Sequence, residues 1–221
     1  MAVSSELLRW FSKNGRHFPW RKTFDNPNPY IILFTEMMLL RTKANQVVPV
    51  YNEFVRKYPT FNKLAGASDR DISRLFSPLG LKWRAKRIIK LTRYLDQHYN
   101  GRVPDDFTKL RELPGVGDYV AKAVLCYAFG RREGPVDTNV VRVVTRLFGK
   151  PQNPDVARRN KIIAELTTSL VPKGDKNARR FNLALLDLGA LVCKPKPLCD
   201  KCPLNSYCEY YQQNRPRPGA E

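Results

Sequence analysis

The sequence predicts an all-α protein. Apolar residues recur at the spacing of a helix face, most clearly over residues 87–95 and 162–170. No stretch alternates apolar and polar residues as a half-buried strand would. Asn, Asp, Pro and Gly fill the gaps between the periodic stretches, and these residues favour turns and helix ends.

Helices are expected along most of the chain, joined by short loops. Asn28 with Pro29 is typical of a helix start, because the side chain caps the first turn and proline fits there. Gly130 is typical of a helix end, and the residues after Tyr211 are expected to be frayed. The expected helices span residues 4–12, 29–40, 44–58, 61–66, 69–76, 82–99, 106–112, 118–129, 138–148, 156–171 and 177–192.

The helix over residues 29–40 is apolar on every side except at Thr35 and Glu36, which predicts that it is buried. A buried carboxylate is costly, and loss of water raises its pKa. Acids of this kind gather at functional sites, which makes Glu36 a candidate site residue. An ion pair with Arg41 or another base is the structural alternative.

A hairpin signal, Leu-Pro-Gly-Val-Gly-Asp-Tyr, occupies residues 113–119 between two of the expected helices. Gly115 and Gly117 flank Val116, so the backbone can turn tightly with positive φ and leave its N–H groups uncovered. Bare amides at a helix N-terminus bind anions. The pattern therefore predicts a helix-hairpin-helix that grips phosphate, although an ordinary turn between helices has similar residues.

The charge of the chain favours nucleic acid as the partner. Thirty-nine Lys and Arg against twenty Asp and Glu give a net charge of +19 and a pI of about 10.0. A chain this basic usually meets a polyanion. Membrane-surface and ribosomal-type proteins are the alternatives, but no basic amphipathic helix dominates, and the longest apolar stretch, residues 30–40, is too short to span a bilayer. No signal peptide is evident, so we expect an intracellular protein, cytoplasmic or nucleoid-associated.

Four cysteines cluster near the C-terminus, at positions 193, 199, 202 and 208. Cysteines of an intracellular protein are expected to be reduced or bound to metal. Cys193, Cys199, Cys202 and Cys208 could hold a [4Fe–4S] cluster or a zinc ion. The single Cys-x2-Cys pair and the wide outer gaps favour the [4Fe–4S] cluster. Cys126 lies among apolar residues and is expected in the core.

Asp137 precedes the apolar run over residues 140–144 and is expected at the N-cap of a helix. Capping alone would explain this aspartate, and the local sequence favours that interpretation. The helix dipole and amides are expected to keep the carboxyl ionised. An ionised carboxylate facing a groove could stabilise an oxocarbenium-like sugar or activate water against it.

Residues 113–117, Asp137 and the cysteine cluster together resemble the base-excision DNA glycosylase superfamily that includes endonuclease III. The resemblance extends over nearly the whole chain, although the first cysteine gap is one residue shorter than that superfamily usually has. Further matching motifs are Phe-Pro-Trp at 18–20, Asn-Pro-Tyr-Ile-Ile-Leu-Phe-Thr-Glu at 28–36, Leu-Gly-Leu at 79–81, Phe-Asn at 181–182 and Asp-Leu-Gly at 187–189.

The resemblance implies two helical lobes with a DNA groove between them. One lobe would span residues 25–134 and carry the helix-hairpin-helix. The other would combine residues 1–24 with residues 135–221 and hold the iron–sulfur cluster. Asp137 and Tyr119 would face each other across the groove.

The residue that follows Gly117-Asp118 separates reaction types within the superfamily. The bifunctional branch carries lysine there and forms a Schiff base, whereas adenine glycosylases usually carry serine. Tyr119 resembles the thymine/uracil mismatch glycosylases, which implies a monofunctional enzyme. Lys122 is expected to be an ordinary solvated lysine, and a merely hydrophobic role for Tyr119 against the flipped sugar stays open.

The resemblance also assigns residues that handle the flipped base. Glu36 would recognise the base or protonate it, Leu40 with Arg41 would fill the vacated stack, and Leu81 would act as a second wedge. Core packing is the alternative for Leu81. Asn139 would hold the sugar or phosphate near Asp137. Candidate contacts to the DNA backbone are Arg142, Arg146, Lys194, Lys196 and Lys201.

The predicted function is therefore a monomeric DNA glycosylase that removes thymine or uracil mispaired with guanine from double-stranded DNA. An adenine glycosylase acting opposite 8-oxoguanine is the alternative within the enzyme class. Tyr119 and the end of the chain soon after the cysteines argue against it. A non-catalytic DNA-binding protein that keeps the hairpin and cluster for structure is the alternative outside the enzyme class.

Overall fold

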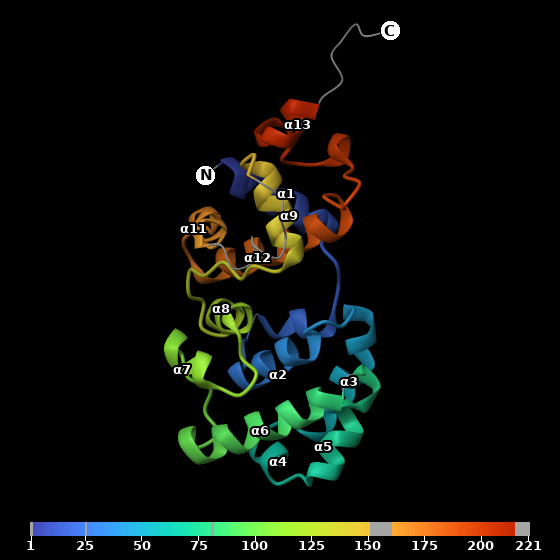
Figure 1. Cartoon of the computed structure of the whole chain (residues 1–221), viewed down its shortest axis with the longest axis vertical. Helices are drawn as coiled ribbons and strands as arrows, with labels where there is room; N and C mark the ends of the chain where they lie inside the picture. Colours follow the sequence, from blue (N-terminus) through green and yellow to red (C-terminus); the bar gives the residue numbers. More distant parts are fainter. Residues whose placement is uncertain (1, 25, 81, 151–160, 215–221) are drawn as a thin grey trace, which may run out of the picture. The chain divides into compact units, whose positions relative to one another are not determined.

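The computed structural model describes residues 2–24, 26–80, 82–150 and 161–214, and all regular structure in these ranges is helical (Figure 1). The prediction of an all-α fold is confirmed for these residues. None of the helices described is long and apolar enough to cross a membrane. Leu81, the expected helix start at residues 156–160 and most of the expected frayed tail lie outside the described residues.

The helix bounds agree closely with the expected ones, and a short C-terminal helix adds to them. The α-helices are α1 Ala2–Asn14, α2 Pro29–Leu39, α3 Ala44–Lys57, α4 Phe61–Ala65, α5 Asp69–Phe76, α6 Lys82–Tyr99, α7 Phe107–Glu112, α8 Asp118–Tyr127, α9 Thr138–Leu147, α11 Lys161–Leu170, α12 Asp175–Leu191 and α13 Glu209–Asn214. Short 3-10 helices are η1 Pro19–Phe24, η2 Ser77–Leu79, η3 Cys199–Lys201 and η4 Asn205–Tyr207.

The chain divides into two compact units. Residues 17–131 form one, here called the hairpin unit, and residues 1–16 with 132–221 form the other, here called the cysteine unit. The division falls several residues before each expected boundary, and local contacts account for this. Trp20 packs edge-on against Tyr51 of α3, with ring centroids 5.5 Å apart, which ties η1 to the hairpin unit. Arg132 donates to the Val171 carbonyl at 2.7 Å, which ties it to the cysteine unit.

Helix α2 is the core of the hairpin unit and packs against α3, α6 and α8. Every residue from Tyr30 to Met38 is buried, as predicted. The Asn28 side chain accepts hydrogen bonds from the Tyr30 and Ile31 amides, which confirms the predicted cap. Aromatic rings fill the space between α2 and its neighbours and include those of Tyr30, Phe34, Phe54, Phe61 and Phe76.

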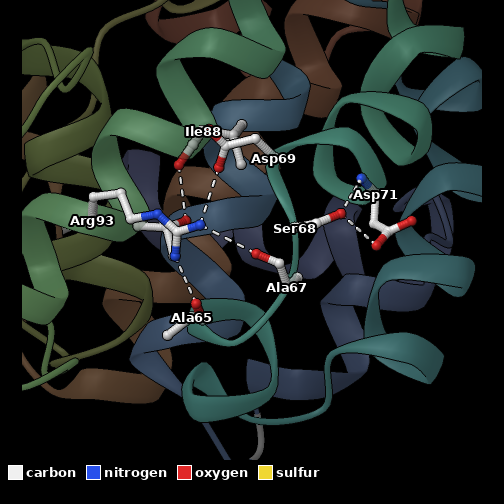
Figure 2. Close-up of polar contacts among 8 residues, drawn as sticks. Ala65, Ala67, Ser68, Asp69, Asp71, Ile88 and Arg93 are labelled. Carbon is white, nitrogen blue, oxygen red and sulfur yellow. Dashed lines mark hydrogen bonds and ion pairs between the residues drawn. The ribbon is translucent and has the colours of Figure 1, made fainter.

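Arg93 joins α6 to the connection between α4 and α5 (Figure 2). Its guanidinium donates to the Ala65 carbonyl at 2.6 Å and the Ala67 carbonyl at 3.2 Å, and it contacts the Asp69 carboxylate at 3.0 Å. The Ser68 hydroxyl accepts the Asp71 amide at 3.1 Å and so caps α5. A single side chain of α6 therefore satisfies the last carbonyl of α4 and one carbonyl of the connection that follows it.

Helices α9 and α12 form the centre of the cysteine unit, with α1 against α12, and α11 and α13 against α9 (Figure 1). Gly189 permits the close approach of α12 to α9, because a Cβ there would lie 2.7 Å from the Asn139 Cβ. The fully buried Asp187 accepts from the Arg16 amide and guanidinium, both at 2.7 Å. This ion pair fixes the segment that follows α1 onto α12.

Candidate nucleic-acid interface

Asp137 is the N-cap of α9, as the sequence predicted. Its Oδ1 atom accepts the Val140 amide at 2.7 Å, and its Oδ2 atom accepts the Asn139 side-chain amide at 3.0 Å. The apolar face of α9 is buried, so the cap holds the carboxyl at a fixed point beside a rigid helix. Capping and a chemical role are therefore compatible at this position.

The electrostatics of Asp137 differ from the expectation. Burial raises the pKa of the Asp137 carboxyl, and this effect outweighs the amide hydrogen bonds and the Arg142 charge that lower it. The cap and the helix dipole were expected to favour the ionised carboxyl, and the loss of water on folding, which the sequence does not reveal, acts in the opposite direction. A shielded carboxyl of this kind is typical of functional sites.

Arg142 and Asn139 extend the contacts of Asp137 into the segment of residues 193–208 that carries the four cysteines, here called the cysteine loop. Arg142 Nη2 donates to Asn139 Oδ1 at 2.8 Å, which turns the Asn139 amide nitrogen toward Asp137. The same guanidinium donates to the Gly189 carbonyl at 2.7 Å and the Cys193 carbonyl at 2.6 Å. The sequence suggested Arg142 for the DNA backbone, whereas its Nε and Nη2 atoms bond inside the protein.

The hairpin between α7 and α8 has one left-handed residue, Gly115, with φ of 83°. A Cβ at Gly115 would lie 3.0 Å from Met37 and 3.1 Å from Arg87, so the turn sits tightly on α2 and α6. Gly117 was also expected to have positive φ, but its backbone is extended with φ of −96°. No atom lies within 4 Å of a Cβ added to Gly117, so this side of the hairpin is open.

Val116 and Arg111 hold the hairpin together. Val116 is 4% exposed, its amide donates to the Leu113 carbonyl at 3.0 Å, and its carbonyl accepts from Arg111 at 2.8 Å. Arg111 also forms an ion pair with Asp118 at 2.6 Å. Val116 thus packs in the core and stabilises the turn. The sequence motif alone does not distinguish this structural role from contact with DNA.

Helix α8 begins without a side-chain cap. Gly117 is its N-cap and cannot supply one, so the first-turn amides are available to an anion. Tyr119, the second residue of α8, and Lys122, one turn further, are both partly exposed. Gly130, with φ of 67°, and the bond from the Arg131 amide to the Leu125 carbonyl close the helix end.

Glu36 lies on α2 and is 5% exposed, which confirms the predicted burial. Leu40 is the C-cap of α2, and the exposed Arg41 after it has a left-handed φ of 54°. The Thr42 amide donates to the Leu39 carbonyl at 3.1 Å, so Leu40 and Arg41 form the tip of a tight turn. A second turn ends at Gly80, with φ of 69°, directly before Leu81 in the sequence.

The four C-terminal cysteines are all free thiols and partly exposed. Burial and the charges of neighbouring cysteines raise the pKa of Cys202 to about 11 and raise those of Cys199 and Cys208. In the described ranges no three Cys, His, Asp or Glu side chains are arranged to hold a metal ion. Four cysteines within sixteen positions are nevertheless the kind of donor set that metal clusters use. Cys126 is fully buried in α8, as predicted.

Arg146 supports this loop from α9. Its guanidinium donates to the Cys193 sulfur at 3.5 Å and to the Lys194 and Pro195 carbonyls at 2.6 and 2.9 Å. It also lies 4.9 Å from the centroid of the Tyr210 ring. The sequence suggested a DNA contact for Arg146, but the side chain is 6% exposed and holds the cysteine loop instead.

The candidate residues are divided between the units. The hairpin unit carries Glu36, the Leu40–Arg41 turn, residues 115–117 and Tyr119. The cysteine unit carries Asp137, Asn139, Arg142 and the four cysteines. A helix-hairpin-helix with an uncapped helix start, a shielded carboxyl and a cysteine loop is the set of features expected of a DNA-binding protein.

Comparison with known proteins identifies the family. Residues 34–169 match the HhH-GPD superfamily of base excision DNA repair proteins, and the chain belongs to this superfamily. The resemblance predicted from the sequence is thereby confirmed.

Several relatives cover nearly the whole chain. A thymine/uracil-DNA glycosylase from Methanothermobacter thermautotrophicus is 39% identical over 95% of this chain and 93% of its own length. An adenine DNA glycosylase from Mycobacterium tuberculosis is 37% identical over 96% of this chain but 68% of its own length. The solved structure of a thermostable thymine-DNA glycosylase superimposes with a TM-score of 0.86, at 37% identity, and covers 96% of this chain and 95% of that one.

Proposed function

We propose that this protein is a monofunctional DNA glycosylase that hydrolytically removes thymine or uracil mispaired with guanine. The observation that carries this proposal is the shielded, hydrogen-bonded carboxyl of Asp137 at the N-cap of α9. Held there, the carboxylate stabilises the positive charge that develops on the sugar as the base departs, or activates water against that sugar.

Tyr119 supports the monofunctional assignment. A phenol cannot form a Schiff base with the sugar, whereas an amine at this position could. Lys122 lies one turn further along α8, where a lysine needs no chemical role. The product is therefore an abasic site in an unbroken strand.

Glu36 is assigned to the base itself. Its burial in α2 gives a polar group inside an apolar wall, which suits recognition of the Watson–Crick edge of a flipped pyrimidine. Leu40 and Arg41, at the tip of their turn, and Leu81 would occupy the space that the base leaves in the stack. The open side of Gly117 and the uncapped start of α8 would bind the phosphate backbone.

The thymine/uracil branch is favoured over adenine removal on two grounds. Tyr119 occupies the position where adenine glycosylases usually carry serine. The thymine/uracil relative matches this chain over 93% of its own length, against 68% for the adenine relative.

The cysteine loop is proposed to hold a [4Fe–4S] cluster through Cys193, Cys199, Cys202 and Cys208. Such a cluster would neutralise the four thiolates and fix the shape of the loop. Arg146 would lie against the cluster and offset its negative charge. Metal analysis of the purified protein tests this: iron and sulfide at four per chain support it, and stoichiometric zinc contradicts it.

A panel of duplexes tests the activity. Each duplex carries thymine, uracil or adenine opposite each of guanine and 8-oxoguanine, and products are resolved with and without alkali. Release of thymine and uracil opposite guanine, with strand breaks only after alkali, is the expected result. Release of adenine alone would contradict the assignment to the thymine/uracil branch. Strand breaks without alkali would contradict the monofunctional assignment. Binding without any base release would leave a structural DNA-binding protein.

A further inference from the structure

Arg84 is a completely buried cation that bridges two turns of the hairpin unit. It is the third residue of α6, and its side chain has no exposed surface. Nη1 donates to the Leu79 carbonyl at 2.9 Å, and Nη2 donates to the Leu40 carbonyl at 2.5 Å. Neither the charge pattern nor the helix periodicity of the sequence distinguishes this arginine from its basic neighbours in α6.

The burial of Arg84 is energetically unfavourable. Loss of water on burial lowers the pKa of its guanidinium. Its Nε atom is buried without a hydrogen-bond partner, and no carboxylate pairs with it among the described residues. An apolar side chain would fill this space at a lower desolvation cost. What arginine adds is the pair of contacts to the Leu40 and Leu79 carbonyls.

Both carbonyls belong to turns that the proposed function assigns to the DNA stack. Leu40 and Arg41 form the tip of the first turn, and Leu79 precedes the left-handed Gly80 of the second. A Cβ added to Gly80 would meet no atom within 4 Å, so the second turn is open on that side. Since a guanidinium is a planar fork, donation from both Nη atoms fixes the distance and the direction between the two turns.

We propose that Arg84 is a positioning residue that holds these two turns in one register, so that they enter the DNA stack together. The proposal rests on the proposed function, which assigns the first turn to DNA through Leu40 and Arg41 and the second through Leu81. Arg84 does not touch DNA in this role. It acts through the Leu40 and Leu79 carbonyls and favours the state in which the base is flipped out.

Substitution of Arg84 by lysine tests the proposal, because a single ammonium group cannot reproduce the fork. Arg93→Lys is the matched control, since Arg93 also lies on α6 and donates to two carbonyls, but at the end of α4 (Figure 2). The probe is 2-aminopurine next to a G·U mispair, whose fluorescence rises when its neighbour leaves the stack. Affinity for undamaged duplex, single-turnover base release and thermal unfolding are measured alongside.

Arg84→Lys is expected to reduce both the fluorescence rise and the rate of base release, the latter about 10- to 100-fold. Affinity for undamaged duplex should change less than about threefold, because the phosphate contacts are intact. Arg93→Lys should lower the unfolding temperature but leave the fluorescence rise unchanged. Equal effects of the two substitutions on fluorescence, or no effect of Arg84→Lys, would overturn the proposal.

Two further measurements separate the possible failures. Leu40→Ala should reduce the fluorescence rise; if it does not, the assignment of the turn to DNA fails together with this inference. If Leu40→Ala reduces the signal and Arg84→Lys does not, only the role of Arg84 fails. If Arg84→Lys does not fold, hydrogen exchange of the wild-type protein tests the proposal instead. The Arg41 and Gly80 amides should become protected from exchange together when the protein binds mismatched DNA. Protection of only one of them would contradict the proposal.

Discussion

At the scale of single residues, the hydrogen bonds of Asp137 stabilise the fold, whereas burial of its charged form destabilises it. The cap hydrogen bonds stabilise α9, while burial raises the pKa of the carboxyl. A raised folded-state pKa means that the ionised group destabilises the fold as pH rises above the unfolded value of about 3.9. This cost is present at neutral pH, where the proposed reaction needs the carboxylate.

Asp137→Asn should therefore separate activity from stability. We expect the rate of base release to fall by at least about 100-fold. The unfolding temperature at neutral pH should rise, because the desolvated charge is removed and Asn can still cap the Val140 amide through its oxygen. The rise is reduced by the lost hydrogen bond from Asn139, whose side-chain amide then faces a second amide donor. The gain should shrink as pH falls toward the unfolded pKa of about 3.9 and vanish below it, where aspartate is protonated in both states. Single-turnover base release and thermal melts across pH measure the two effects. A variant that is inactive and also less stable at neutral pH would contradict the electrostatic argument.

Arg142 offers a second residue-scale prediction, on the pH dependence of the reaction. Its charge lowers the Asp137 pKa, and it orients Asn139 through the 2.8 Å contact. Arg142→Met should raise the Asp137 pKa further, so the acidic limb of the pH–rate profile should move to higher pH. Arg132→Met is the matched control, since Arg132 also donates to two carbonyls of the same unit. An unshifted acidic limb in Arg142→Met would count against this role.

At the scale of elements, the two hairpin glycines serve different purposes. Gly115→Ala meets an unfavourable φ and contacts of 3.0 and 3.1 Å, so it should cost about 1 kcal/mol or more of stability. Gly117 has an ordinary φ and no atom near an added Cβ, so Gly117→Ala should leave stability nearly unchanged. The substitution nevertheless places a methyl group on the open side of the turn. We expect Gly117→Ala to weaken duplex binding at least about threefold. Chemical denaturation and binding titrations of both variants check this; wild-type binding by Gly117→Ala would show that phosphate does not approach there.

The elements also show what the sequence could and could not predict. Helix α2 was predictable because its cap, first-turn proline and apolar run are local signals. The Asp137 cap followed from the apolar run after it. The inward bonds of Arg142 and Arg146 were not predictable, because their acceptors lie about fifty positions away in the chain. Arg84 is the clearest case, since the Leu40 carbonyl that it binds is 44 positions away.

At the scale of the whole molecule, the excess of basic side chains is expected to attract the phosphates of DNA. The net charge of +19 is spread along the chain, and the salt bridges between described residues use few of its basic groups. Lys194, Lys196 and Lys201 are exposed around the cysteine loop and stay predicted contacts to the DNA backbone. We expect such a surface to bind the phosphates of duplex DNA of any sequence.

Salt should therefore act on binding far more than on chemistry. If the protein neutralises about six to ten phosphates, affinity for undamaged duplex should fall by about 10³- to 10⁵-fold between about 50 and 200 mM salt. Single-turnover base release at saturating protein should change only a few-fold over the same range, because the buried Asp137 carboxyl is little screened by salt. Titrations by fluorescence anisotropy and quenched-flow reactions at matched salt give the two quantities. An affinity that changes less than about tenfold would mean that the excess charge does not meet the DNA backbone, and the open hairpin would then have to account for binding on its own.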